Sequence, residues 1–202
     1  MQAIEDKVIS RIYGKGRGWA FFKNDFVDLG SADAIDKALS RLTKSQRIRR
    51  VMRGVYDYPK YSHLLEQQLS PDIDKVAQAL ARKFGWTIQV SGNTALNILG
   101  LSTQVPARYL YLSNGDSRTY QIDGVELNFK QTALKDMELK SSESALLVQA
   151  LKTRGQQRIS LSEKQKILAY FSKEKYSTIL KDTQYMTSWV YEQIKQIFEV
   201  KA

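Results

Sequence analysis

The spacing of apolar residues in the first third of the chain predicts three consecutive helices. Apolar side chains recur at helical spacing from Ile4 to Ile12 and stop at a group of glycines that begins at Gly14. A short second helix is expected to be capped by Asn24 and to end at Gly30 in a left-handed conformation. Ser31 is placed to cap the third helix, whose apolar stripe is formed by Ala32, Ile35, Ala38, Leu39 and Leu42.

A change in pattern follows the third helix. Between Gln46 and Tyr58, β-branched and aromatic residues flank Arg53-Gly54, which predicts a β-hairpin that ends at Pro59. The polar stretch 60–70 is interpreted as a linker in which His63 is exposed. The first domain is therefore expected to span residues 1–62.

The rest of the chain, residues 70–202, predicts a second domain. An amphipathic helix should open at Ser70-Pro71 and close at Gly85, and a small mixed sheet should follow, with a hairpin at Asp123-Gly124. Beyond Lys135 the pattern is helical. The predicted elements after Gly85 are a strand at 86–90, a helix at 93–99, strands at 108–112, 120–122 and 125–129, a helix at 142–153, a helix that follows the capping box Ser160-Leu161-Ser162-Glu163, and a last helix at 186–197.

Charge is concentrated in the first domain. The chain has 31 Lys and Arg against 21 Asp and Glu, a formal net charge of +10, which favours a polyanionic partner. Residues 1–60 hold 13 basic and 7 acidic side chains. The segment from Lys37 to Arg53 holds seven basic side chains and no acidic one. The basic excess is therefore a local feature of the third helix and the hairpin.

The predicted order of elements is that of a winged helix-turn-helix: two helices, a third helix with a basic face, and a hairpin. In that fold the third helix lies in the major groove of duplex DNA. The fold class expected is thus α+β, an N-terminal winged helix-turn-helix followed by a small mixed α/β domain with a helical C-terminal tail. Five side chains are expected to contact phosphates, with a log-log salt slope of roughly −4 to −5: Lys44, Arg47, Arg49, Arg50 and Arg53. The residues expected to face base edges are Ser31, Lys37, Ser40 and Arg41.

Several kinds of chemistry are excluded by composition. The chain has no cysteine, and its single histidine, His63, cannot form a multi-histidine metal site. No metal, cofactor or catalytic residue is therefore expected, and the protein is not expected to be an enzyme. The chain lacks an apolar run long enough to span a bilayer, and its first residues do not resemble a secretory signal, so a cytoplasmic protein that does not bind membranes is expected.

Other charged residues and glycines allow three further interpretations: a nuclease site, a nucleotide site and a second basic surface. Asp123 with Glu138 and Lys140 resembles the acidic pair and lysine of a metal-dependent nuclease, although such residues more often lie on an exposed connection. The glycines at 14, 16 and 18 follow a helix instead of a strand, which favours a loop over a nucleotide site. Basic residues on a helix are most often a solvent-exposed face with no ligand. This interpretation is favoured for the C-terminal lysines over the alternative that they form a second basic surface. These lysines are Lys164, Lys166, Lys173, Lys175 and Lys181.

Two segments resemble a known family. They are Arg49 to Pro59, with the sequence RRVMRGVYDYP, and Ser91 to Pro106, with the sequence SGNTALNILGLSTQVP. Over roughly residues 1–135 the chain is similar to the AbiEi family of antitoxins from type IV toxin-antitoxin, or abortive infection, systems. The resemblance is carried over only to the exposed face of the predicted recognition helix and to the wing residues Arg49, Arg50, Arg53, Gly54 and Tyr56.

The resemblance implies a role in phage defence. It implies an N-terminal winged helix that represses the protein's own promoter, commonly at inverted repeats, and a C-terminal domain that counters a nucleotidyltransferase-type toxin. An antitoxin of this type need not bind its toxin directly. One alternative function is a stand-alone winged-helix transcriptional regulator without a toxin. A metal-dependent DNA-processing enzyme is a third, less favoured alternative.

Overall fold

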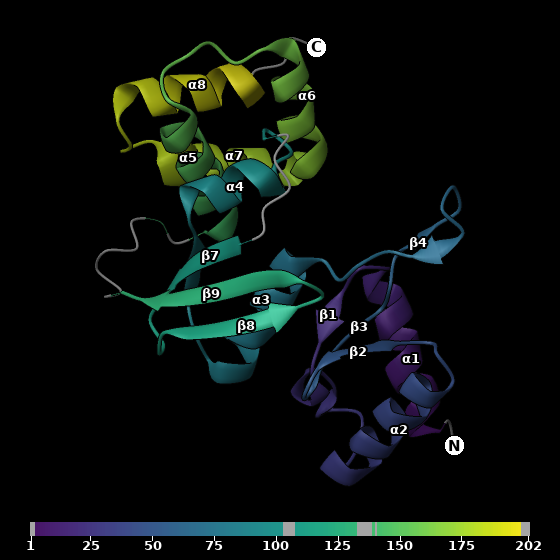
Figure 1. Ribbon diagram of the computed structural model, residues 1–202. Coiled ribbons are helices and arrows are strands. Elements are labelled where there is room, and N and C mark those ends of the chain that lie inside the picture. The colour runs from purple at the N-terminus through teal and green to yellow at the C-terminus, as the bar shows by residue number, and fades with distance from the viewer. Residues whose placement is uncertain (1–2, 103–107, 133–138, 140, 199–202) are drawn as a thin grey trace. The chain divides into compact units, whose positions relative to one another are not determined.

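Helices and short strands are combined in two units, so the fold class is α+β as predicted (Figure 1). The computed structural model describes residues 3–102, 108–132, 139 and 141–198. Contacts between Cα atoms divide the chain into one unit of residues 1–86 with 121–124 and another of residues 87–120 with 125–202. Each unit is built around its own sheet and helices.

The first unit begins with helices that enclose an apolar core. Its elements are α1 (Ile4–Lys15), β1 (Ala20–Phe21), the 3-10 helix η1 (Lys23–Phe26), α2 (Ala32–Lys44), β2 (Arg49–Met52) and β3 (Val55–Asp57). The core joins Val8, Ile9, Ile12, Phe21, Phe26, Ile35, Ala38, Leu39, Leu42 and Ile48. The predicted stripe of α2 is therefore confirmed except at Ala32, which is exposed because it stands at the first position of the helix, outside that core.

The short second helix differs from its prediction at both ends. It begins at Lys23 with Phe22 as the N-cap residue, and the Asp25 carboxylate accepts a hydrogen bond from the Phe22 N–H at 3.1 Å. The expected cap at Asn24 is thus wrong, because the helix is a single 3-10 turn whose N-cap lies two residues earlier. Gly30 does not have a positive φ. A Cβ there would lie 2.1 Å from Cδ1 at the end of the Ile4 side chain, so Ile4 packs directly against this glycine.

The strands of the first unit form an antiparallel sheet in the order β1-β3-β2. The predicted hairpin is confirmed, with Gly54 at φ 74° in its turn. Side chains alternate between the two faces of the sheet. Phe21 stacks on Tyr56 on the face toward the helical core, while Ala20 and Val55 are buried outside that cluster.

The helix α3 (Ile73–Phe84) covers β1 and β3 and belongs to the first unit. Asp72 caps it by accepting from the Lys75 N–H, and Gly85 closes it in a left-handed conformation as predicted. The predicted domains assigned this helix to residues 70–202. The helix belongs to the first unit because its apolar face packs on the side of the sheet that the helical core leaves uncovered, and both surfaces are thereby buried.

The segment expected to be a linker contains a small hairpin. Strands β4 (Tyr61–Ser62) and β5 (Gln67–Gln68) pair antiparallel and form an arm that Figure 1 shows extending from the rest of the first unit. His63 is exposed at its end as predicted, and so are Leu64 and Leu65.

A four-stranded mixed sheet is found as predicted, and all of it except residues 121–122 belongs to the second unit. Its strands β6 (Ile88–Val90), β7 (Arg108–Ser113), β8 (Arg118–Ile122) and β9 (Val125–Gln131) lie in the order β6-β7-β9-β8. Strand β7 is antiparallel to β6 and parallel to β9. The tight turn between β8 and β9 has positive φ at Asp123 and Gly124, the conformation that an Asp-Gly pair favours.

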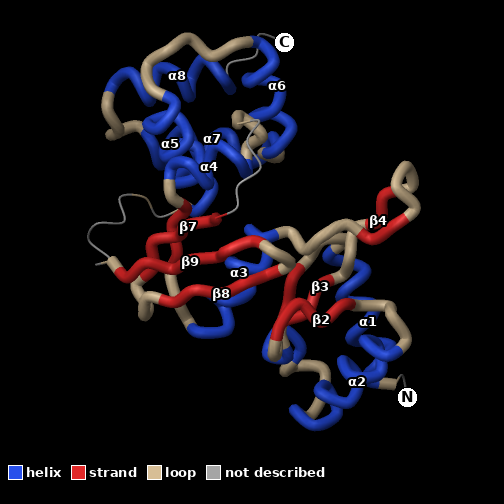
Figure 2. The backbone as a smooth tube through the Cα atoms, in the orientation of Figure 1, coloured by secondary structure: helices blue, strands red, loops and turns tan. Residues whose placement is uncertain are grey.

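Helices complete the second unit (Figure 2). They are α4 (Gly92–Ile98), α5 (Ser142–Arg154), α6 (Leu161–Tyr170), η3 (Lys173–Lys175), α7 (Tyr176–Thr183) and α8 (Ser188–Phe198). The capping box at Ser160 and Glu163 is confirmed at the start of α6. Helix α5 buries residues around most of its circumference, because α4, α7, α8 and β6 all contact it.

Candidate nucleic-acid interface

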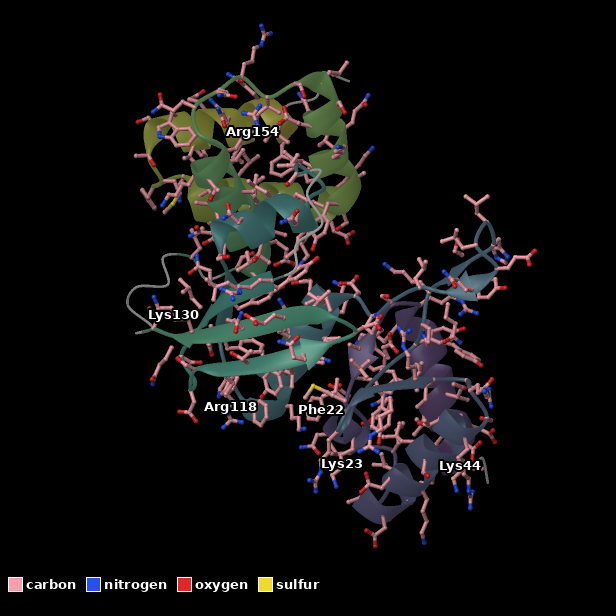
Figure 3. The ribbon with its side chains drawn as sticks, viewed as in Figure 1. Phe22, Lys23, Lys44, Arg118, Lys130 and Arg154 are labelled. Carbon is pink, nitrogen blue, oxygen red and sulfur yellow. The ribbon has the colours of Figure 1, made fainter. Side chains whose placement is uncertain are left out.

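One face of α2 presents the residues expected to read DNA. Lys37, Ser40, Arg41 and Lys44 are all exposed. Their spacing of three and four residues aligns them along one side of the helix, opposite the buried stripe. Figure 3 labels Lys44 at the end of this row.

Acidic neighbours neutralise this face only in part. Arg41 lies 3.7 Å from the Glu5 carboxylate of α1, with 70% of its side chain exposed. Asp36 is paired with Lys23 at 3.1 Å. Within residues 3–102, 108–132, 139 and 141–198, no carboxylate lies within ion-pair distance of Lys37 or Lys44.

Ser31 has a structural task at the start of α2. Its Oγ accepts a hydrogen bond from the Ala34 N–H, as the sequence predicted for a cap. The side chain is exposed, and its hydroxyl can still donate a proton. Ser31 therefore stabilises the start of α2 and lies outside the row formed by Lys37, Ser40, Arg41 and Lys44.

The hairpin β2–β3 carries three further exposed arginines. Arg50 and Arg53 are exposed on β2 and in the turn. Arg47, just before β2, donates two hydrogen bonds to the Tyr13 hydroxyl, at 3.2 and 3.1 Å, and lies 5.6 Å from the centre of that ring. Tyr13 orients the guanidinium without neutralising it, so Arg47 keeps its charge for an anionic partner.

Arg49 differs from the other arginines of the basic run. Its guanidinium forms two hydrogen bonds with the Asp57 carboxylate, at 3.0 and 2.6 Å, and a third with the Leu69 carbonyl at 2.9 Å. Only 27% of its side chain is exposed. The structure thus brings Lys37, Ser40, Arg41 and Lys44 together on α2 and Arg50 and Arg53 on the hairpin, whereas Arg49 is engaged within the fold.

Lys83 is a candidate that the sequence analysis missed. Its Nζ donates to the Arg53 carbonyl at 3.3 Å and would lie 3.1 Å from a Cβ at Gly54. Partial burial lowers the pKa of Lys83, and the positive charge of Arg53 lowers it further. The residue follows the hairpin by thirty positions in a different helix, so no local pattern could place it beside the turn.

The acidic residues that resemble a nuclease site are described only in part. Asp123 lies in the β8–β9 turn, while Asp136, Glu138 and Lys140 are outside the described residues. No group of three or more His, Asp or Glu side chains suited to a metal ion occurs in the part of the chain that the structure describes.

The C-terminal lysines are partly engaged in contacts of their own. Lys164 donates to the Gln196 carbonyl, Lys166 donates to the Gly100 carbonyl at 2.8 Å, and Lys175 pairs with Glu143 at 3.1 Å. Lys173 and Lys181 are exposed.

Among the described residues, none of the helices combines the length and the apolar character that a membrane span requires.

Comparison with known proteins assigns a family. The profile of DUF6088, described as a family of unknown function, matches residues 7–179. The chain belongs to the DUF6088 family. The match covers the exposed row of α2, the hairpin and Lys83, and it continues through most of the second unit.

Solved structures similar to this DUF6088 chain were also found. The crystal structure of RV2827C protein from Mycobacterium tuberculosis is 16% identical, with a TM-score of 0.42, and the alignment covers 98% of this chain and 77% of that chain. No curated protein matches the chain.

Proposed function

We propose that this DUF6088 protein is a DNA-binding transcriptional regulator whose first unit is a winged helix-turn-helix. The order α1, β1, η1, α2, β2 and β3 supports this proposal, because it is the element order of that fold with the second helix shortened to η1. Helix α2 takes the place of the recognition helix, and the β2–β3 hairpin takes the place of the wing. The double-stranded DNA is expected to be the protein's own promoter.

The observation that carries the proposal is the arrangement of cations on α2 and the hairpin. Lys37 and Lys44 are exposed with no acidic partner among the described residues, and they share one helix face with Arg41. The turn of the hairpin adds Arg53, and Lys83 of α3 donates to its carbonyl. A positive field over two neighbouring elements suits the phosphates of a duplex, because each contact releases condensed counterions.

The positions of the side chains suggest a division of tasks. Lys37, Ser40 and Arg41 occupy the middle of α2, where a recognition helix contacts base edges. Arg47, Arg50 and Arg53 lie in or beside the hairpin and suit phosphate contacts. With Lys83 in place of Arg49, the phosphate-contact set is again five residues, and a slope of roughly −4 to −5 in log affinity against log salt is expected: Lys44, Arg47, Arg50, Arg53 and Lys83.

The proposal is tested by binding of the full chain to duplexes at several salt concentrations. The probes are the DNA upstream of its own gene and an unrelated duplex of equal length. Changing both Lys44 and Arg53 to Gln should weaken binding to both duplexes and flatten the slope by about two units. Lys173→Gln, which removes an exposed charge from the second unit, is the matched control. A slope that the double variant leaves unchanged would contradict the proposed interface.

Base reading is tested separately with Arg41→Ala. Because Arg41 is on the outer face of α2, its loss should change the preference between the upstream duplex and the unrelated one. An equal loss of affinity for both duplexes would remove Arg41 from base reading.

We further infer that the regulator is an autorepressor and antitoxin of a type IV toxin-antitoxin system, acting against a nucleotidyltransferase-type toxin. The similarity of Arg49–Pro59 and of Ser91–Pro106 to AbiEi antitoxins favours this function. The first segment forms the hairpin and the residues after it, and the second begins with the residues that open α4. Direct binding to the toxin is not required by the proposal.

Co-expression with the neighbouring open reading frame tests the antitoxin function. The neighbour alone should arrest growth, and this chain should restore it. Restoration should persist in the Lys44 and Arg53 double variant, because neutralising a toxin does not use the DNA-binding face. A harmless neighbour, or toxicity that this chain does not relieve, would leave the stand-alone regulator as the function.

An enzymatic function is not proposed. Plasmid incubated with the chain and Mg²⁺ is expected to remain intact. Cleavage that is lost in Asp123→Ala would establish the DNA-processing alternative instead.

A further inference from the structure

A basic cleft of about 400 Å³ lies in the first unit. It is formed by the end of α1, the loop to β1, and one side of α3. Its lining residues are Lys15, Arg17, Gly18, Trp19, Ala20, Lys60, Asp72, Lys75, Gln78 and Arg82. None of the predicted DNA contacts lines it, so this cleft is a separate feature of the unit.

The charge of the cleft is incompletely balanced. Arg82 is neutralised, because two of its nitrogens bind the Asp25 carboxylate at 3.2 Å. Lys60 and Lys75 have looser partners, with Nζ 3.6 Å from Asp72 and 3.9 Å from Asp74 respectively. These separations exceed an ordinary hydrogen bond, so both ammonium groups can turn toward another anion.

Arg17 and Lys15 have no carboxylate partner within the described part of the chain. Arg17 is nevertheless held in place. One of its nitrogens donates to the Pro59 carbonyl at 2.8 Å, and its guanidinium lies 4.6 Å from the centre of the Tyr58 ring. A neutral carbonyl and a ring orient a guanidinium without cancelling its charge, and the remaining N–H groups stay available.

The glycines on either side of Arg17 let Lys60 approach the same loop. Gly16 and Gly18 both have positive φ, at 84° and 90°, which turns the loop between α1 and β1. A Cβ at Gly18 would lie 2.5 Å from Cε of Lys60, so the absence of a side chain lets Lys60 approach the loop. Lys60 and Arg17 are thereby brought to the same cleft.

We propose that this cleft binds a phosphate group, with Arg17 as its oriented donor and Lys15, Lys60 and Lys75 as surrounding charges. An oriented guanidinium can donate two parallel hydrogen bonds to phosphate oxygens. Several ammonium groups with weak partners favour a dianion over a single carboxylate. The volume lies within the usual range for small-molecule sites of about 300–1,000 Å³. The phosphate belongs to a small phosphorylated molecule or to a nucleic-acid backbone.

The first test is a calorimetric or NMR titration of the full chain with inorganic pyrophosphate at low ionic strength. Arg17→Gln should weaken binding at least tenfold. Since Arg17 also contacts Pro59 and Tyr58, a second variant that changes Lys15 and Lys75 to Gln removes charge without removing those contacts, and it should weaken binding as well. Lys173→Gln, which removes an exposed charge from the second unit, is the control for total charge and should bind as the wild type does. Equal affinity in all four proteins, or no binding, overturns the proposal.

The second test separates the two sources of phosphate by competition with bound pyrophosphate. Displacement by adenosine monophosphate, but not by a short DNA duplex, assigns a small molecule. Displacement by the duplex, with a flatter salt slope in the Lys15 and Lys75 variant, assigns the nucleic-acid backbone. If neither adenosine monophosphate nor the duplex displaces pyrophosphate, the proposal is overturned. Because the cleft shares no residue with the α2 and hairpin set, these results are independent of the DNA-binding tests on Lys44, Arg53 and Arg41.

Discussion

Arg49 and Asp57 face each other across β2 and β3, and the guanidinium holds the carboxylate at 2.6 Å. Asp57 is buried, with 2% of its side chain exposed. The same arginine also reaches the Leu69 carbonyl, which follows the arm. This pair therefore ties the base of the hairpin to the segment that leads into α3.

Removing Arg49 should destabilise the protein more than removing the charge of Asp57. Arg49→Met leaves a buried carboxylate without its partner, and a loss of about 3 kcal/mol in the free energy of unfolding is expected. Asp57→Asn leaves an arginine that is partly exposed, so about 1–2 kcal/mol is expected. Urea denaturation of the purified variants measures both.

The neighbouring Arg50 supplies the control for this comparison. Arg50→Met changes an exposed side chain of the same strand and should alter stability by about 0.5 kcal/mol or less. If Arg49→Met is as stable as the wild type and flattens the salt slope of DNA binding by about one unit, Arg49 is a phosphate contact and not a fold contact.

Lys83 should contribute to DNA binding although it lies outside the basic run. Its Nζ is held at the Arg53 carbonyl, where a phosphate could contact both side chains. Lys83→Gln should flatten the salt slope by about one unit. Because burial lowers the pKa of this amine, the charged form costs the free protein stability, and the variant should unfold no more easily than the wild type. An unchanged slope would exclude Lys83 from the interface.

The ion pair between Arg154 and Glu163 should make the stability of the second unit depend on acid. Hydrogen bonds from Arg154 and Ser160 lower the pKa of Glu163 to about 2 from an ordinary 4.5. A carboxyl group with a lowered pKa stabilises the fold above its unfolded pKa, and this contribution is lost as the pH falls from about 5 to 2. Figure 3 labels Arg154, whose side chain is 13% exposed.

Glu163→Gln provides the corresponding measurement. At pH 7 the variant should be less stable by about 1–3 kcal/mol, and the difference from the wild type should narrow steadily below pH 5. Glu192→Gln removes a carboxylate that is 58% exposed and should show little change at any pH. A constant difference between pH 7 and pH 3 would show that the ionised pair does not cause the effect.

Gly92 should be required where α4 meets α5. A Cβ at this position would lie 1.7 Å from Oγ1 of Thr153 and 2.9 Å from its Cβ. In an open helix, Gly→Ala stabilises by up to about 1 kcal/mol. Here the clash should reverse the sign, and Gly92→Ala should destabilise by about 1–3 kcal/mol in thermal or urea unfolding.

Thr153→Ala separates this clash from other effects of the substitution. Alone it changes an exposed side chain and should be nearly neutral. Combined with Gly92→Ala it removes Oγ1 but not Cβ, so it should restore part of the lost stability. A Gly92→Ala variant that is as stable as the wild type would mean that the helices can separate at this point without cost.

Local patterns determined many elements of this protein from its sequence. The apolar stripe of α2, the cap at Ser31, the capping box at Ser160 and the turns at Gly54 and Gly124 were all predicted and found. Each depends on residues within about one helical turn or within one hairpin, where spacing and backbone preference suffice. The sequence thereby also determined that Lys37, Arg41 and Lys44 share an exposed face.

Contacts between distant segments were decided only by the tertiary structure. The sequence could not show that Asp57 would form an ion pair with Arg49 or that Lys83 would donate to the Arg53 carbonyl. Nor could it show that α3 would pack on the sheet of the first unit. It also could not show that Gly30 would lie against the Ile4 side chain and would not adopt a left-handed conformation. Which cations remain available to a ligand therefore depended on the packing of the strands and α3, because a charge is neutralised by neighbours in space, whatever their separation along the chain.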